Sequence, residues 1–316
     1  RARRVREIST VLIAGAISGA LMMLILKQPD LGSAITFMPV LLGMLFCAGA
    51  EVSHLLGITS FGLMAAAMPF LFTFLQVRFA GAPPGSWAYF VMQTGKLGFH
   101  TGLVFAAFAL GSALLWRLSV MARLQIRGMF FVAMPIILSA GLFSGIMVNR
   151  QLKSYQRSRF VAYVAPQADI QGASYNVHQS QIAIGSGGMF GKGLFSGTQS
   201  KLGFLPERHT DFIYAVIGEE MGFLGTISIL GLYLLLIYRI VSVGRAARDR
   251  YGYLICAGLA AMFGFQLLLN VGMCVGLMPV TGVPLPLISY GGSSLVITLW
   301  AIGIVANIYA RRYALL

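Results

Sequence analysis

The chain has 316 residues, of which 58% are hydrophobic and only 10% are charged. A typical soluble domain carries about 25% charged residues, so this composition excludes a soluble globular protein. The net charge of +14 could suit a nucleic-acid-binding protein, but the basic residues are spread over the segments between apolar runs, where contact with anionic membrane lipids and membrane orientation explain them better than nucleic acid does.

Eight apolar runs approach or exceed the length needed to cross a bilayer as a helix, about 20 residues. The predicted spans lie at about 8–26, 33–50, 55–77, 100–116, 128–148, 212–238, 252–277 and 285–309. We therefore expect an all-α polytopic integral membrane protein. The segment 78–99 is expected to be an outer loop with an interfacial aromatic piece, since it contains Trp87, Tyr89 and Phe90.

The distribution of Lys and Arg predicts the orientation of the spans. Four of residues 1–7 are arginines, which places this end in the cytoplasm, and eight spans return Arg311 and Arg312 to the same side. Inner segments then carry 13 Lys and Arg residues and outer segments 10. Seven of the ten lie in a long extracytoplasmic loop at about 149–210: Arg150, Lys153, Arg157, Arg159, Lys192, Lys201 and Arg208. Composition leaves open whether this charge holds an anionic ligand or attracts anionic lipid headgroups.

The most distinctive stretch is 181–222, where a glycine-rich run and a dense polar cluster precede an apolar helix. The glycine-rich run does not match the phosphate-loop pattern. Ser186 stands where the first Gly is required, and Gly193 stands where Ser or Thr should follow Lys192. Two interpretations remain: a flexible loop whose backbone N–H groups and Lys192 hold an anion, or simply a tight turn.

Several acidic residues are candidates for chemistry. Asp211 stands at the start of a predicted helix, where it or Thr210 could cap the helix. Alternatively, the Asp211 carboxylate could act as a general base at the membrane surface. Glu219 and Glu220 lie about 12 Å further along that helix, and we expect them to be structural or to line a cavity. Asp30 either bonds its own turn or is a second site carboxylate on the same outer side.

The segment 278–294 contains three Pro and three Gly at a predicted helix junction. Non-helical backbone at membrane depth is tolerated only where it is buried in protein or lines a cavity, so we expect this segment to form a wall of the outer cavity. His178 and His209 lack metal-ligand spacing, and Cys47, Cys256 and Cys274 lie in apolar spans. The sequence therefore predicts no metal site. It leaves the cofactor unknown: a divalent cation stays open, although the sequence does not indicate one.

Three motifs resemble one known family. They are KQPDLGSA at 27–34, QSQIAIGSGGMFGKGLFSGTQSKLGFLPERHTDFIYAVIGEEMG at 179–222 and GLMPVTGVPLPLISYGGSS at 276–294. Together they resemble the shape, elongation, division and sporulation (SEDS) family, and its RodA elongation branch more than its FtsW division branch. The resemblance implies a single SEDS-type transmembrane domain over 1–316. Because family members usually have ten spans, it also implies that the N-terminal family helices are absent here, and that residues about 80–125 add an extra hairpin.

The resemblance further implies a membrane glycosyltransferase that polymerises lipid II into peptidoglycan strands at the outer face of the bacterial cytoplasmic membrane. Such an enzyme serves cell elongation and rod-shape maintenance and works with a class B penicillin-binding protein. Asp211, in the HTDF motif, matches the family's catalytic acid. The positions that match cavity-lining motif residues, which we expect to bind substrate, are Asp30, Lys192, Lys201, Glu207, Arg208 and Ser289.

In the expected reaction a sugar hydroxyl attacks the anomeric carbon of the donor chain and displaces undecaprenyl pyrophosphate with inversion. Asp211 would accept the proton, and nearby Lys and Arg residues would stabilise the pyrophosphate. Two alternatives remain: a lipid II flippase, because intramembrane acids and broken helices also suit transporters, and a non-catalytic scaffold for a penicillin-binding protein. The polar cluster lies at one membrane face rather than at the midplane, which favours the enzyme.

Overall fold

The structure is a computed structural model that describes residues 8–28, 30–124, 127–165, 172–205 and 207–313. These residues form helices joined by turns and irregular segments, without strands. Among them, eight helices are long and apolar enough to cross a membrane. They are α2 (Ile8–Lys27), α3 (Leu31–Ala48), α4 (Val52–Arg78), α6 (Phe99–Met121), α7 (Met129–Gln151), α11 (Ile213–Arg245), α12 (Arg250–Cys274) and α13 (Gly292–Ala310). The predicted all-α, multi-pass membrane fold is confirmed.

The predicted start of the last span was wrong. The span was expected from residue 285, but α13 begins at Gly292. Leu287 has a left-handed φ of 67°, and Gly291 is extended with a φ of 169°. Neither conformation continues a right-handed helix, so 275–291 remains an irregular segment between α12 and α13.

The segments expected to be loops contain shorter helices. The interfacial aromatic piece forms α5 (Trp87–Thr94), whose N-cap Ser86 accepts a hydrogen bond from the Tyr89 N–H at 3.2 Å. Within the loop at 149–210 lie α8 (Ser154–Val164), α9 (Ala173–Ser186) and α10 (Thr198–Lys201). The 3-10 helix η2 (Arg311–Tyr313) closes the described chain.

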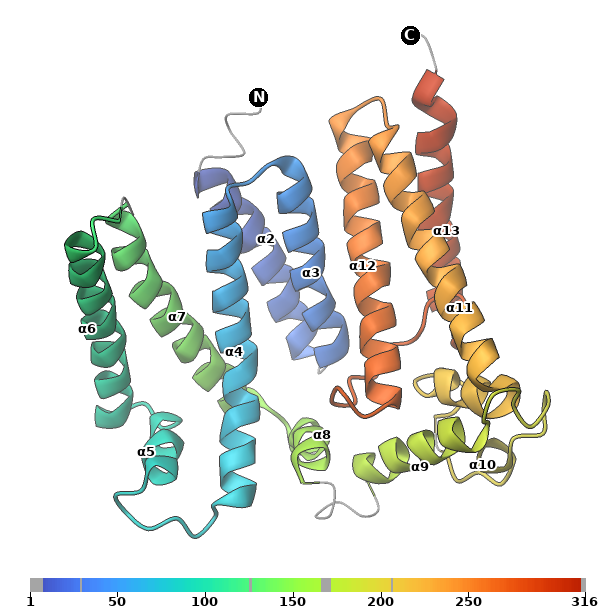
Figure 1. The fold of residues 1–316 in the computed structure, drawn as a ribbon, viewed down its shortest axis with the longest axis horizontal. Helices are drawn as coiled ribbons and strands as arrows, with labels where there is room; N and C mark the ends of the chain where they lie inside the picture. The colour runs from blue at the N-terminus through green and yellow to red at the C-terminus, as the bar shows by residue number, and fades with distance from the viewer. Residues whose placement is uncertain (1–7, 29, 125–126, 166–171, 206, 314–316) are drawn as a thin grey trace. The chain divides into compact units, whose positions relative to one another are not determined.

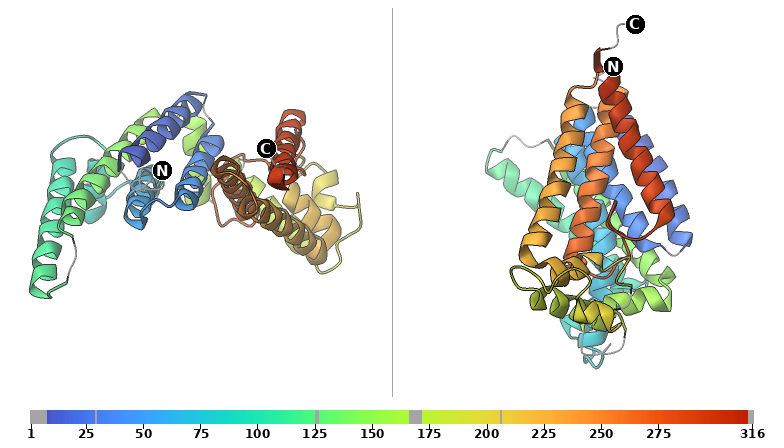
Figure 2. Two further views of the ribbon diagram at one scale, coloured as in Figure 1. Left: turned by 90° about the horizontal axis from the view of Figure 1, so that it is seen from above. Right: turned by 90° about the vertical axis from the view of Figure 1, so that its right-hand side faces the viewer.

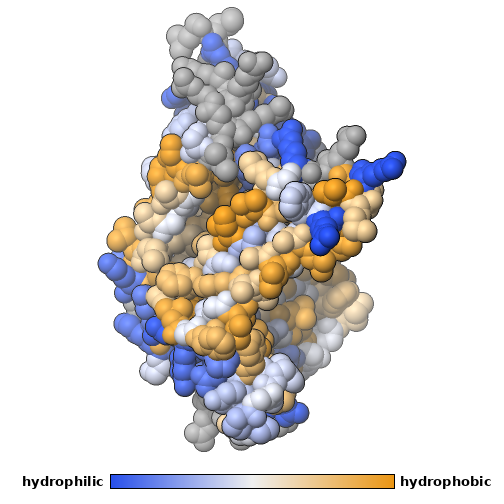
Figure 3. Space-filling view, turned by 90° about the vertical axis from the view of Figure 1, so that its left-hand side faces the viewer, coloured by the Kyte–Doolittle hydropathy of each residue, from blue (hydrophilic) through white to orange (hydrophobic). Residues whose placement is uncertain are grey.

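Contacts between Cα atoms divide the chain into two compact units. Unit 1 comprises residues 1–51 and 169–316, and unit 2 comprises residues 52–168. In unit 2, α4 packs against α7, α6 packs against α7, and α5 and α8 contact α4. Its core contains Phe72, Leu142 and Ile146. Over this unit, Figure 3 shows a face on which apolar side chains predominate in the middle, as a surface in contact with lipid requires. The single domain expected from the family resemblance stays a prediction.

Unit 1 carries all the predicted site residues. In it α3 packs against α2 and α12, and α11 packs against α12, with α13 contacting both α11 and α12 (Figure 2). The connections that hold the site, including α9 and α10, lie at the end of unit 1 where α2 and α12 finish and α3 and α11 begin (Figure 1). The start of α2 and the end of α13 lie at the opposite end.

Candidate functional site

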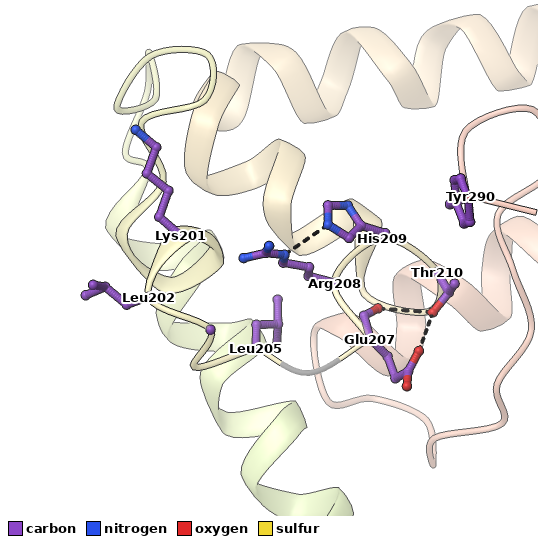
Figure 4. A pocket seen from close by; sticks show the side chains of 9 residues that line it. Lys201, Leu202, Leu205, Glu207, Arg208, His209, Thr210 and Tyr290 are labelled. Carbon is purple, nitrogen blue, oxygen red and sulfur yellow. Dashed lines mark hydrogen bonds between the residues drawn. The ribbon is translucent and has the colours of Figure 1, made fainter.

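An open pocket of about 540 Å³ lies in unit 1 beside the beginning of α11 (Figure 4). It is lined by Lys201, Leu202, Gly203, Leu205, Glu207, Arg208, His209, Thr210 and Tyr290. Three of the predicted substrate-binding residues, Lys201, Glu207 and Arg208, therefore line one cavity. Asp211 follows the lining residues His209 and Thr210 directly in the chain.

A tight turn at 207–212 leads the chain from the pocket into α11. The Glu207 carbonyl accepts hydrogen bonds from the N–H groups of Thr210 at 3.2 Å and Phe212 at 3.3 Å. The Thr210 hydroxyl donates to the Glu207 carboxylate at 3.1 Å. Glu207 itself has a φ of 54°, a conformation that is costly for a residue with a side chain and that persists only where the surroundings enforce it.

Neither Asp211 nor Thr210, the two candidates of the capping alternative, occupies the N-cap position of α11. The N-cap of α11 is Phe212, which makes no side-chain capping hydrogen bond. The turn at 207–212 occupies the Thr210 hydroxyl instead.

Hydrogen bonds from distant residues fix three consecutive backbone carbonyls beside the pocket. The Tyr290 N–H donates to the His209 carbonyl at 2.7 Å, and the Ser289 hydroxyl donates to the Thr210 carbonyl at 2.6 Å. The Asn270 side-chain amide donates to the Asp211 carbonyl at 3.0 Å. The backbone that carries the half-buried Asp211 side chain is thus held by α12 and by the 275–291 segment.

This arrangement revises the expectation for Ser289 and adds Asn270. Ser289 does not line the pocket; its hydroxyl donates to the Thr210 carbonyl and accepts from the Leu285 N–H at 2.7 Å. Asn270 is fully buried and also donates to the Val283 carbonyl at 2.9 Å. Sequence reasoning missed Asn270, although an amide inside an apolar span is the kind of residue that usually has a partner or a function.

Lys192 was expected to bind an anion, but its ammonium is already paired inside the protein. It lies 2.9 Å from Oε1 of Glu219, a carboxylate with no exposed surface, and 2.8 Å from the Thr198 hydroxyl. The same Glu219 oxygen accepts from the backbone N–H groups of Thr198 and Gln199 at 2.7 and 3.0 Å. Glu219 therefore has the structural role that was one of its two expected roles. Lys192 is its ion-pair partner and does not line the pocket.

Two backbone N–H groups of the glycine-rich run are also occupied by α11. The N–H groups of Lys192 and Gly193 donate to the carbonyls of Glu219 and Glu220, each at 3.0 Å. These two N–H groups are therefore not available to an anion, because the run packs against α11 where that helix is broken at Gly222 (φ 65°, ψ −162°). The glycines permit this close approach between two segments of backbone.

Asp30 is the N-cap of α3, and its carboxylate accepts the Ser33 N–H at 3.0 Å. The next helical turn packs closely on the 275–291 segment, since a Cβ at Gly32 would lie 2.6 Å from the Thr281 carbonyl oxygen. Asp30 does not line the pocket. Asp30 lies at the same end of unit 1 as the pocket. The 275–291 segment on which its helix packs is hydrogen-bonded at Val283 to Asn270, which also donates to the Asp211 carbonyl.

The charged side chains that line the pocket are Lys201, Arg208 and Glu207. Of the described carboxylates, none forms an ion pair with Lys201 or Arg208. The Arg208 Nε–H donates to Nε2 of His209 at 3.0 Å, and Figure 4 shows the Arg208 and Glu207 side chains directed away from each other. Two cations with free donors suit a phosphate or pyrophosphate group. Among the described residues, no three His, Cys, Asp or Glu side chains gather closely enough to hold a metal ion.

Comparison with known proteins identifies relatives over nearly the whole chain. The family model described as "Cell cycle protein", which represents FtsW, RodA and SpoVE, matches residues 1–82 and 80–314. "Peptidoglycan glycosyltransferase RodA" from Treponema pallidum is 36% identical over 303 residues, which are 95% of this chain and 67% of that protein. "Peptidoglycan glycosyltransferase MrdB" from Escherichia coli K12 is 42% identical over 214 residues, which are 67% of this chain and 58% of that protein.

Two solved structures are also similar in sequence. The Rod shape-determining protein RodA of Thermus thermophilus is 28% identical, with a TM-score of 0.34, over 90% of this chain and 97% of that one. A chain from a peptidoglycan synthase complex is 26% identical, with a TM-score of 0.45, over 96% of this chain and 98% of that one.

Proposed function

Because the chain belongs to the "Cell cycle protein" family of FtsW, RodA and SpoVE, we propose that it is a peptidoglycan glycosyltransferase that polymerises lipid II during cell elongation. The observation that carries this proposal is the position of Asp211, an acid directly beside a pocket lined by Lys201 and Arg208, two cations that form no ion pair with any described carboxylate. The identity to enzymes named peptidoglycan glycosyltransferase supports it.

The reaction needs one group to accept a proton and others to stabilise a leaving anion. A sugar hydroxyl of the acceptor attacks the anomeric carbon of the donor, forming the glycosidic bond as the bond to undecaprenyl pyrophosphate breaks. The Asp211 carboxylate accepts the hydroxyl proton. General-base catalysis of this kind accelerates a reaction about 10²–10⁴-fold. Lys201 and Arg208 stabilise the charge that develops on the pyrophosphate.

The hydrogen bonds around the pocket support these roles. Proton transfer requires a base held within about 2.6–3.2 Å of its substrate, and the carbonyls of residues 209–211 are fixed by Tyr290, Ser289 and Asn270. Lys192 has no part in pyrophosphate binding in this proposal, since Glu219 occupies its ammonium. Glu207 shapes the turn that leads to Asp211 and orients Thr210.

The remaining expectations follow from the family. The enzyme works at the outer face of the bacterial cytoplasmic membrane, and a class B penicillin-binding protein that crosslinks the strands is its partner. The pocket lies at one end of the membrane-crossing helices of unit 1, where a lipid-linked substrate can reach it with its polar headgroup.

The test is polymerisation of labelled lipid II by the purified protein in detergent or vesicles, with glycan strands separated by gel electrophoresis. Wild type forms strands, and Asp211→Asn lowers the rate by about 10²-fold or more with unchanged thermal unfolding. Normal polymerisation by Asp211→Asn would remove Asp211 as the base. Lipid II transport across vesicles without any polymer would identify a flippase, and loss of both activities with increased crosslinking by a bound penicillin-binding protein would identify a scaffold.

A further inference from the structure

The connection between α9 and α10 exposes large apolar side chains at the outer end of unit 1. Met189, Phe190, Leu194 and Phe195 are 56, 81, 66 and 78% exposed; we call these four residues the apolar loop tip. They come from a segment outside the membrane-crossing helices, where contiguous exposed apolar surface marks an interaction with a protein or a membrane.

The apolar loop tip continues the lipid-facing surface of α11. The N–H groups of Phe223 and Leu224 donate to the carbonyls of Gly188 and Met189 at 2.9 and 3.2 Å. The side chains of Phe223 and Leu224 are themselves 53 and 47% exposed on a membrane-crossing helix. Figure 1 shows the connection beside the broken end of α11.

Four backbone hydrogen bonds join the connection to α11 around its break. The break at Gly222 removes helical hydrogen bonds from α11, and backbone N–H and C=O groups without partners are costly in lipid. The connection replaces these bonds, since Lys192 and Gly193 donate to the carbonyls of Glu219 and Glu220 while Phe223 and Leu224 donate back. Such a break is compatible with the hydrocarbon boundary.

The charged side chains next to the apolar loop tip also have ion-pair or hydrogen-bond partners within the protein. Lys192 and Glu219 form an ion pair at 2.9 Å. The Glu220 carboxylate accepts the N–H of Phe195, a tip residue with a φ of 57°, at 3.0 Å. Charged groups that already have partners lose less when water leaves than isolated ones do.

We propose that the apolar loop tip inserts into the acyl chains of the bilayer leaflet beside the pocket and anchors the connection there. The occupant is phospholipid, because the tip is continuous with a lipid-facing helix surface and the charged groups beside it have partners within the protein. Insertion would hold α10, which ends at Lys201, at the level of the lipid headgroups. This anchoring does not depend on the proposed reaction.

The test uses tryptophan fluorescence in phospholipid vesicles. In a chain whose three tryptophans, Trp87, Trp116 and Trp300, are replaced by Phe, a single probe is introduced as Phe190→Trp or, in a second protein, Phe195→Trp. Phe223→Trp on α11 is the matched lipid-facing control. Each protein is reconstituted in vesicles with or without phospholipids brominated on their acyl chains, and acrylamide is added as a water-soluble quencher.

We expect blue-shifted emission from both tip probes, with a loss of emission in brominated vesicles as large as that of Phe223→Trp and little further loss with acrylamide. Quenching of both probes by acrylamide and not by brominated lipid would overturn the proposal. In that case the tip faces water and is available to a protein partner. Since each probe exchanges one exposed aromatic side chain for another, the fold is retained, and circular dichroism checks this.

Discussion

At the scale of single residues, the buried acid Glu219 in the apolar helix α11 is stabilised by an ion pair and several hydrogen bonds. Burying an ionised carboxylate is costly unless it is paired and hydrogen-bonded. Glu219 has no exposed surface, and one of its oxygens accepts from Lys192, from the hydroxyl and N–H of Thr198, and from the N–H of Gln199. Glu219 therefore fixes the connection between α9 and α10. The last residue of α10, Lys201, lines the pocket.

Replacing Lys192 tests this structural role. Lys192→Met leaves the buried Glu219 carboxylate without its cation, and losing a partner of a buried polar group costs about 1–3 kcal/mol. We expect a lower thermal unfolding temperature in detergent, measured by intrinsic fluorescence.

Arg208→Gln is the control for Lys192→Met, because Arg208 lines the pocket and its donor contact is with the exposed His209. We expect it to unfold like wild type while using lipid II less efficiently. Equal stability of the two variants, with equal losses of activity, would instead place Lys192 in substrate binding.

At the scale of elements, the end of α9 crosses close to the first part of α11. A Cβ added at Gly187 would overlap the carbonyl oxygen of Gly218. Gly185, two residues earlier in α9, has nothing within 4 Å of such an atom. The two glycines therefore have different roles despite their proximity in the sequence.

A matched pair of alanine substitutions separates these roles. We expect Gly187→Ala to destabilise the protein by about 1–3 kcal/mol through overpacking. Gly185→Ala should be neutral, or stabilising by up to about 1 kcal/mol, because alanine favours helix. Chemical unfolding followed by circular dichroism measures both. A neutral Gly187→Ala would mean that α9 and α11 separate readily.

The sequence predicted the membrane-spanning helices better than it predicted which side chains contact one another. Apolar length and flanking charge located the eight spans, because crossing a bilayer imposes a length that composition reveals. The same cluster that singled out Asp211 also identified Lys201, Glu207 and Arg208 as neighbours in one pocket. The ion pair of Lys192 with Glu219 was not predicted, because the two residues are distant in sequence and no local pattern reports which groups meet. Asn270 was missed for the same reason.

At the scale of the whole molecule, the eight spans place every connection on one of two membrane sides. The connection that contains α9 is expected outside, and the turn between α11 and α12 inside. His178 in α9 and Ala246 after α11 are exposed, so a cysteine at either position is accessible to a thiol reagent. The native Cys256 and Cys274 are buried, whereas Cys47 is partly exposed.

Thiol labelling of intact cells tests this arrangement. In a chain without Cys47, Cys256 and Cys274, a cysteine introduced as His178→Cys should react with a membrane-impermeant maleimide added outside. Ala246→Cys should react only after the membrane is permeabilised. Labelling of Ala246→Cys in intact cells would contradict the eight-span topology.

The backbone pairing between the glycine-rich run and the broken end of α11 has a consequence for amide hydrogen exchange. Protection from deuterium follows hydrogen bonding and local opening rather than helical shape. The amides of Lys192 and Gly193, although they belong to an irregular connection, should therefore exchange as slowly as those of the neighbouring α11 turns. Their exchange should also accelerate together with that of Phe223 and Leu224, because all four bonds break in one opening event.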